Sequence, residues 1–149
     1  LTQSVLATSR QPGRVQLKWP PEVCALYADA QMLSIVLSNV LENAYKYSPP
    51  ETPIELELTT RAGPQGRVGW CWRVENAQGA AGLPDPEKVF DKYYRGPHAQ
   101  RQSGSGLGLF LVKSLLELMH GQVVYTPLAH RVRFEVWLPG ETPDSTAAA

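Results

Sequence analysis

Hydrophobic and polar residues alternate along two neighbouring runs in the first half of the chain. In Ile54–Thr60, apolar side chains at every second position alternate with Glu and Thr, which is the period of a strand with one buried face. The second run, Val68–Glu75, has one face made of Val68, Trp70, Trp72 and Val74. Because the turn sequence Gly63-Pro64-Gln65-Gly66 separates the two runs, they are predicted to form a β-hairpin.

The longest helical pattern runs from about Ala30 to Tyr47. Asp29 is a residue type that caps helix N-termini, and Pro49-Pro50 ends the pattern. At about 100° per residue, one arc of this helix is apolar and is predicted to face the core. This arc contains Leu33, Val36, Leu37, Val40, Leu41 and Ala44.

The end of the chain repeats the order of helix and hairpin. The apolar run Gly106–His120 predicts a second helix, which Gly121 would end at its C′ position. A strand pair, Gln122–Thr126 and Val132–Leu138, is predicted on either side of a turn at Pro127–Arg131. One face of the last strand consists of Val132, Phe134, Val136 and Leu138.

The remaining segments place these elements in one fold class. A short strand is predicted at Val15–Trp19, and Asn76–Gly106 is predicted to be mostly loop with one short helical stretch around Pro86–Tyr94. The order strand, helix, hairpin, loop, helix, hairpin is typical of an α+β fold. We therefore expect a two-layer α/β sandwich, with a mixed sheet of about five strands covered on one face by about three helices.

Length and charge agree with one small domain. The chain has 149 residues, of which 43% are hydrophobic, enough to fill a single core. We expect residues 15–138 to form this domain, after a lead-in from an upstream region at 1–14 and before a disordered tail at 139–149. The 14 basic and 14 acidic residues balance, so no overall charge attracts nucleic acid or an anionic membrane. Cys24 and Cys71 lie among apolar residues and are interpreted as reduced core cysteines.

The polar arc of the predicted helix at 30–47 has an unusual composition. It contains Asn39, Glu42, Asn43 and Lys46, although Asn is a poor helix former. An amide oxygen is a hard neutral ligand suited to a hydrated Mg²⁺, and a Lys one turn further on can meet phosphate. A simple solvated face is the alternative interpretation of this arc.

A glycine-rich segment leads directly into the second predicted helix. In Gly104-Ser105-Gly106-Leu107-Gly108-Leu109 the backbone can approach an anion closely, at a helix N-terminus that carries free N–H groups. The preceding segment is basic, with Lys88, Lys92, Arg95 and Arg101 against the single acid Asp91. A phosphate-facing lid explains both features, whereas a flexible helix entry and a solvated loop remain the alternatives.

Taken in order, these segments resemble the ATP-binding catalytic domain of bacterial sensor histidine kinases. This family lies within the superfamily of gyrase, heat-shock chaperone, histidine kinase and mismatch-repair ATPases. Leu37–Pro49 is similar to its N box, Phe90–Arg95 to its F box and Gly104–Leu109 to its G2 box. The resemblance extends from about Val15 to Leu138, and it implies the Bergerat-type ATP-binding fold.

The resemblance implies a role for each matching residue. Asn43 would ligate the Mg²⁺ that bridges the ATP phosphates, with Asn39 assisting from one turn earlier. Lys46 and Arg95 would contact phosphate. Tyr47 would help to wall the nucleotide site, and Tyr94 would lie beside the nucleotide at the base of the lid. The backbone would wrap the phosphates around Gly104, Gly106, Leu107 and Gly108.

One motif departs from the family pattern. The family has Asp-x-Gly-x-Gly after the hairpin, and its carboxylate accepts a hydrogen bond from the adenine amino group. Here Asn76 stands at the Asp position, and the glycines that follow, Gly79 and Gly82, are displaced. An amide oxygen can accept the same hydrogen bond without charge.

The resemblance also implies a reaction and partners. The γ-phosphoryl group of ATP would pass to a histidine on a separate dimerisation domain, and from there to a response regulator. None of His98, His120 and His130 fits the acceptor, which is expected upstream of Leu1. The parent protein would be a homodimer in which this is a cytoplasmic domain, with or without an inner-membrane anchor. Two alternatives stay open: a non-catalytic interaction module, and a serine kinase of the anti-sigma-factor type.

Overall fold

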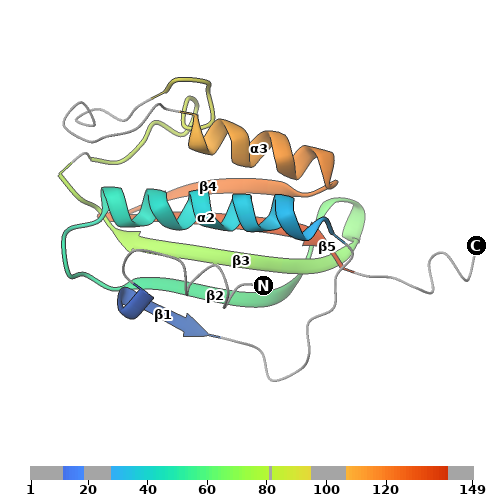
Figure 1. The fold of residues 1–149 in the computed structure, drawn as a ribbon, viewed down its shortest axis with the longest axis horizontal. Coiled ribbons are helices and arrows are strands. Elements are labelled where there is room, and N and C mark those ends of the chain that lie inside the picture. The colour runs from blue at the N-terminus through green and yellow to red at the C-terminus, as the bar shows by residue number, and fades with distance from the viewer. Residues whose placement is uncertain (1–11, 19–27, 81, 95–106, 141–149) are drawn as a thin grey trace, which may run out of the picture.

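A five-stranded sheet with two α-helices packed on one face makes up the core of the protein (Figure 1). The computed structural model describes residues 12–18, 28–80, 82–94 and 107–140. The strands are β1 (Val15–Lys18), β2 (Ile54–Ala62), β3 (Val68–Ala77), β4 (Gln122–Leu128) and β5 (Arg131–Pro139). The helices are α2 (Ala30–Tyr47) and α3 (Gly108–Leu118), with two 3₁₀ turns, η1 (Pro12–Arg14) and η2 (Pro64–Gly66).

The sheet is mixed, as predicted. Its strand order is β1-β2-β3-β5-β4. Strand β1 runs parallel to β2, with Val15 opposite Ile54, and all other neighbours are antiparallel. Helix α2 is the crossover that a parallel pair requires. The predicted α+β sandwich with a five-stranded sheet is therefore confirmed, although the described residues form two α-helices where about three were expected.

Helix α2 has the predicted bounds and the predicted cap. A side-chain oxygen of Asp29 accepts hydrogen bonds from the backbone N–H groups of Gln31 and Met32 at 2.9 and 3.0 Å. The chain leaves the helix at Ser48, whose backbone is extended, because Pro49 disfavours a helical residue before it. All six residues of the predicted apolar arc are buried.

The core lies between this face of α2 and the inner face of the sheet. Alternation places every second residue of the central strands inside, as predicted. These buried residues include Ile54, Leu56 and Leu58 of β2, Trp70, Trp72 and Val74 of β3, and Val132, Phe134, Val136 and Leu138 of β5. Val68, which was predicted to share this face, is 59% exposed at the start of β3.

Ion pairs run across the outer face of the sheet. Glu75 accepts hydrogen bonds from Arg131 and Arg133 at 2.8 and 3.0 Å, and Arg61 lies 2.6 Å from Glu135. Cys71 is a free, buried cysteine on this face, where burial raises the pKa of its thiol. On the outer face of the sheet, these charged side chains are therefore neutralised by their partners, and part of the face is covered from solvent.

Helix α3 ends one residue earlier than its glycine predicts. His120 adopts the left-handed conformation with φ of 60°, so it holds the C′ position that was predicted for Gly121. The N–H of Gly121 donates to Leu116 O at 2.8 Å, and that of His120 donates to Glu117 O at 3.2 Å, which is the Schellman pattern. Gly121 is needed for space, because a Cβ there would lie 2.5 Å from the carbonyl oxygen of Trp137.

The turn of the last hairpin also differs from the prediction. The last hairpin continues to Leu128 and resumes at Arg131, so the predicted five-residue turn has only two residues. Pro127 is tolerated within β4 because this strand lies at the edge of the sheet.

The stretch around residues 86–94 is a series of hydrogen-bonded turns rather than the expected helix. The N–H of Val89 donates to Asp85 O at 2.9 Å, and the N–H of Asp91 donates to Lys88 O at 2.9 Å. Tyr93 has φ of 64°, which a helix cannot contain. Packing holds these turns in place, since Val89 is buried and the Phe90 ring meets the Phe134 ring edge-on at 6.1 Å.

Candidate functional site

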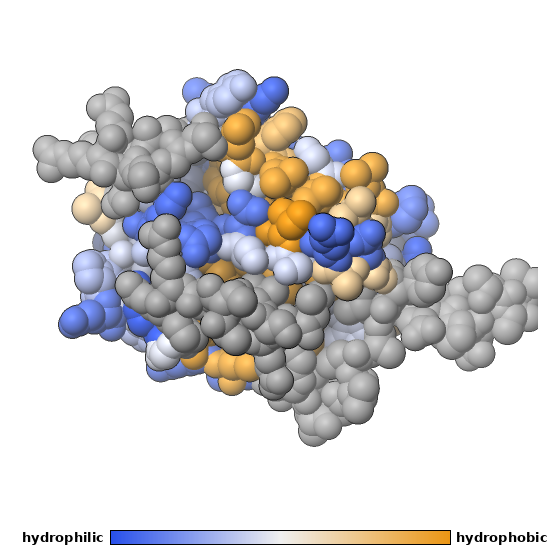
Figure 2. Space-filling view, in the orientation of Figure 1, coloured by the Kyte–Doolittle hydropathy of each residue, from blue (hydrophilic) through white to orange (hydrophobic). Residues whose placement is uncertain are grey.

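The polar arc of α2 lies at the surface but is partly covered. Asn39, Glu42, Asn43 and Lys46 all have intermediate exposure. In Figure 2 hydrophilic residues lie over the C-terminal half of α2, whereas hydrophobic residues gather over α3. A freely solvated helix face would expose these polar side chains more fully, so neighbouring segments partly shield the arc.

The start of α3 meets this arc at Asn39. The amide nitrogen of Asn39 donates to Ile35 O at 2.8 Å, which fixes the side chain along the helix. The amide oxygen of Asn39 lies close to Gly108. A Cβ atom placed on Gly108 would be 3.0 Å from Asn39 Oδ1. The predicted N box and the end of the predicted glycine segment are therefore neighbours.

The first turn of α3 begins at this point without a side-chain cap. The N-cap residue, Leu107, has no side-chain hydrogen bond to the helix. Its carbonyl oxygen accepts from the N–H of Leu111 at 2.9 Å, which closes the first turn. The N–H groups before Leu111 have no partner within the helix, and such groups favour an anion.

Asn76 lies near the end of β3, opposite Ile54 of β2. It is only 1% exposed, and its amide nitrogen donates to Ala77 O at 2.8 Å. This hydrogen bond leaves the amide oxygen as the acceptor, and no group among the described residues donates to it. A buried acceptor without a donor is the chemistry that recognises an amino group.

The loop after β3 lies directly against the end of α2. A Cβ on Gly79 would overlap the carbonyl oxygen of Tyr47, so only glycine fits there. This contact brings the segment that follows Asn76 to the helix turn that carries Lys46 and Tyr47.

Two tyrosines anchor the predicted F box segment. The Tyr94 hydroxyl accepts a hydrogen bond from the N–H of Asp85 at 2.9 Å, and the Tyr125 hydroxyl donates to Pro84 O at 3.0 Å. Burial, with Tyr94 and Asp85 close by, raises the pKa of Tyr125 to about 12. Sequence reasoning missed Tyr125, whose only signal is a tyrosine that follows two valines in the predicted strand.

Two of the four basic residues of the predicted lid lie within the described part of the chain. Lys88 and Lys92 are exposed, and the Lys92 ammonium lies 5.3 Å from the ring centroid of Tyr93 and 5.9 Å from that of Phe110. Arg95, Arg101, Gly104 and Gly106 lie outside the described residues, so the structure does not bear on their predicted roles.

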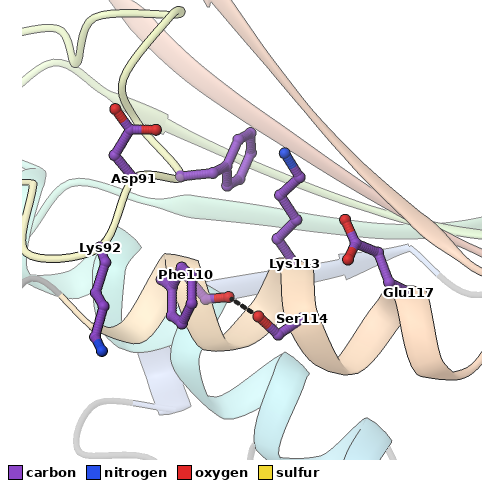
Figure 3. A pocket seen from close by; sticks show the side chains of 7 residues that line it. Asp91, Lys92, Phe110, Lys113, Ser114 and Glu117 are labelled. Carbon is purple, nitrogen blue, oxygen red and sulfur yellow. Dashed lines mark hydrogen bonds between the residues drawn. The ribbon is translucent and has the colours of Figure 1, made fainter.

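A separate hollow of about 330 Å³ lies between the F box turns and the outward face of α3 (Figure 3). It is lined by Phe90, Asp91, Lys92, Phe110, Lys113, Ser114 and Glu117. Lys92 of the predicted phosphate-facing lid lines it, but none of the residues to which the family resemblance gives a role at the nucleotide does. The described residues also contain no group of three or more His, Cys, Asp or Glu side chains that could hold a metal ion.

These features belong to a two-layer α+β sandwich, in which α2 and α3 cover one face of a mixed five-stranded sheet. Residues 28–142 match the family model described as "Histidine kinase-, DNA gyrase B-, and HSP90-like ATPase". The chain belongs to this family of ATPases. The resemblance to the ATP-binding catalytic domain of sensor histidine kinases is thereby confirmed.

Curated relatives are sensor kinases. The chain is 32% identical over 116 residues to the sensor histidine kinase HprS of Escherichia coli K12, covering 76% of this chain and 24% of the relative. It is 34% identical over 127 residues to the sensor histidine kinase CusS of Escherichia coli O157:H7, covering 84% and 25%. The chain thus spans about a quarter of the length of these relatives.

Solved structures show the same fold. The mycobacterial sensor histidine kinase MprB superimposes with a TM-score of 0.71 at 23% identity, covering 94% of this chain and 92% of the other. The catalytic domain of the histidine kinase ThkA gives 0.68 at 19% identity, covering 93% and 91%. No helix among the described residues is long and apolar enough to span a membrane.

Proposed function

We propose that this domain binds Mg²⁺-ATP and transfers the γ-phosphoryl group to a histidine outside the chain, on a dimerisation domain of its parent protein. The observation that carries the proposal is the meeting of Asn39 with Gly108 at the N-terminus of α3. This contact brings the polar arc of α2, on which Asn43 and Lys46 also lie, beside the first turn of α3. Amide oxygens, a lysine and a helix N-terminus would together suit a phosphate chain with its metal ion.

The residues present fit a magnesium ion that is shared with phosphate. Asn43, assisted by Asn39, would supply neutral oxygen ligands from one helix face, and phosphate oxygens and water would complete the shell. Mg²⁺ retains water and is commonly held by few protein ligands together with phosphates, which agrees with the absence of an acidic cluster among the described residues. The ion would neutralise charge on the phosphates.

The remaining roles follow from the family resemblance. The Lys46 ammonium would meet phosphate as a point charge, as would Arg95, and the backbone at Gly104, Gly106, Leu107 and Gly108 would donate to phosphate oxygens. Asn76 would accept a hydrogen bond from the adenine amino group. Tyr47 and Tyr94 would wall the nucleotide site.

The residue at position 39 bears on the reaction. An amide is a poor general base, so Asn39 does not activate water well, and transfer to an external acceptor is favoured over fast hydrolysis. Catalysis then depends on positioning and on charge neutralisation. The partners of the parent protein would be its own dimerisation domain, in a homodimer, and the receiver domain of a response regulator. In the parent, this domain would lie in the cytoplasm.

Calorimetry with Mg²⁺-ATP tests the proposal directly. The native chain should bind, and Asn43→Ala and Lys46→Ala should each weaken binding by about 10- to 100-fold, the value of a hydrogen bond to a charged group. Lys113→Ala, on the outward face of α3, is the matched charge control and should bind like the native chain. Native affinity for Mg²⁺-ATP in both Asn43→Ala and Lys46→Ala would overturn the proposed nucleotide site. No binding by the native chain would instead favour the non-catalytic interaction module.

The acceptor is tested separately. The native chain, mixed with the dimerisation region of its parent and γ-labelled ATP, should label a histidine in an acid-labile form. An acid-stable label on a serine of another protein would favour the serine kinase.

A further inference from the structure

Arg14 connects the first described segment of the chain to the end of α2. This entering segment consists of the turn η1 (Pro12–Arg14) and strand β1 (Val15–Lys18). The Arg14 guanidinium nitrogen Nη2 donates to Ser48 Oγ at 2.7 Å and to Pro49 O at 3.1 Å. Its Nε donates to Thr52 O at 3.0 Å. One side chain thus binds three successive points of the turn that leads from α2 to β2.

These acceptors are the groups that end the helix. Ser48 is the C-cap of α2 and is only 7% exposed. Pro49 O also accepts from the N–H and the hydroxyl of Thr52, at 3.3 and 2.6 Å. Arg14 further lies over the Tyr45 ring, 5.7 Å from its centroid. A cation is favoured at this negative end of the helix dipole, and only the planar fork of Arg can reach all three oxygens at once.

A second contact fixes the same helix end. The backbone at Gly79 leaves no room beside the carbonyl oxygen of Tyr47. The end of α2 is therefore held both by Arg14 and by the loop that follows Asn76. Lys46 and Tyr47 lie on the last turn of this helix.

Arg14 is also tied to the sheet. Strand β1 begins at the next residue, where Val15 pairs with Ile54 of β2. A displacement of the entering segment would therefore move the guanidinium relative to Ser48 and Pro49. This makes a short mechanical connection from the entry of the domain to the helix turn of the nucleotide site.

We infer that Arg14 is a positioning residue for the nucleotide site, which couples the segment entering the domain to the turn that carries Lys46 and Tyr47. The inference rests on the proposed function, since the ligand at that turn is ATP. Coupling is reciprocal, so bound nucleotide should in turn hold the entering segment more firmly.

The test compares two ends of one helix. Arg14→Ala loosens the C-terminal end of α2, and Asp29→Ala removes the cap at its N-terminal end. Both variants should lose stability, but Arg14→Ala should weaken Mg²⁺-ATP binding by about tenfold, whereas Asp29→Ala should change it less than about twofold. Arg14→Lys, which keeps the charge but has one nitrogen, should fall between the native chain and Arg14→Ala.

Hydrogen exchange gives a readout that stability alone would not change. Mg²⁺-ATP should slow exchange at the amides of residues 15–18 in the native chain, and this protection should be lost in Arg14→Ala. If Arg14→Ala does not fold, the same measurements are made on Arg14→Lys. The inference is overturned if Arg14→Lys binds Mg²⁺-ATP with native affinity and its amides at residues 15–18 are protected as in the native chain. If the native chain binds Mg²⁺-ATP but Arg14→Ala and Asp29→Ala weaken that binding equally, the inference is overturned while the proposed function stands. Failure of the native chain to bind ATP overturns both.

Discussion

The α-carbon of Gly79 faces the carbonyl oxygen of Tyr47 so closely that a Cβ atom would overlap it. Gly79→Ala must therefore push the loop after β3 away from the end of α2. We expect a loss of about 1 to 3 kcal/mol in the free energy of unfolding, the usual cost of overpacking, and weaker Mg²⁺-ATP binding. Urea unfolding and calorimetry measure the two effects. Gly13→Ala is the control, because nothing lies within 4 Å of its Cβ position.

Asn76 offers a prediction in which stability and affinity change in opposite directions. Asn76→Asp loses the hydrogen bond to Ala77 O and buries a carboxylate, so the chain without nucleotide should lose about 1 to 3 kcal/mol. The charged acceptor should bind the adenine amino group more strongly, with an affinity about tenfold higher. Thermal unfolding with and without Mg²⁺-ATP measures both quantities, and Asn76→Ala should lower both. Weaker ATP binding by the Asp variant would place the adenine elsewhere.

Tyr125 should make stability fall at high pH. Its pKa is raised to about 12 in the folded chain by burial, Tyr94 and Asp85, against an ordinary value of 10. The contribution of protonated Tyr125 to the free energy of unfolding is therefore fully present below pH 10. It is lost as the pH rises towards 12, and the free energy of unfolding falls by at most roughly 2 to 3 kcal/mol. Chemical unfolding between pH 9 and 12, compared with Tyr125→Phe, isolates this effect. The stability difference between the two proteins should shrink with rising pH, and a constant difference would contradict the prediction.

Glu75 should have the opposite effect at low pH. Burial opposes its ionisation, but the hydrogen bonds from Arg131 and Arg133 hold the pKa of its carboxyl below the ordinary 4.5. The contribution of ionised Glu75 to the free energy of unfolding is present above pH 4.5. It is lost as the pH falls through the lower pKa that Glu75 has in the folded chain. Glu75→Gln should cost about 1 to 3 kcal/mol at pH 7 and less in acid, as measured by urea unfolding at both pH values. The control is Glu55→Gln, since Glu55 is 45% exposed and lies 3.7 Å from Arg131.

Local patterns were sufficient to predict most of the fold. The bounds of α2 were correct because the apolar period, the Asp29 cap and Pro49 all act within the helix or next to it. The strands were found because alternation reflects one buried face. The turns at residues 86–94 were missed because they are stabilised by contacts distant in sequence, such as Phe90 against Phe134.

The candidate site shows the same limit. The residue types on the α2 arc and the glycines before α3 could be identified from spacing. Their meeting at Asn39 and Gly108, and the contact of Gly79 with Tyr47, depend on how distant segments pack. The Arg14 contacts with Ser48 and Thr52 join residues 34 and 38 positions apart, and no periodic pattern marks such a pair.

The buried tryptophans provide optical probes on both sides of two adjacent strands. Trp70 and Trp72 of β3 face the helices, while Trp137 of β5 lies on the outer face, and all three are at most 8% exposed. Their fluorescence therefore reports separately on the helix layer and on the turn that covers Trp137 near Gly63 and Gly69. Detachment of the helices before the sheet unfolds would red-shift the emission of Trp70 and Trp72 first, and single-tryptophan variants would resolve the two steps.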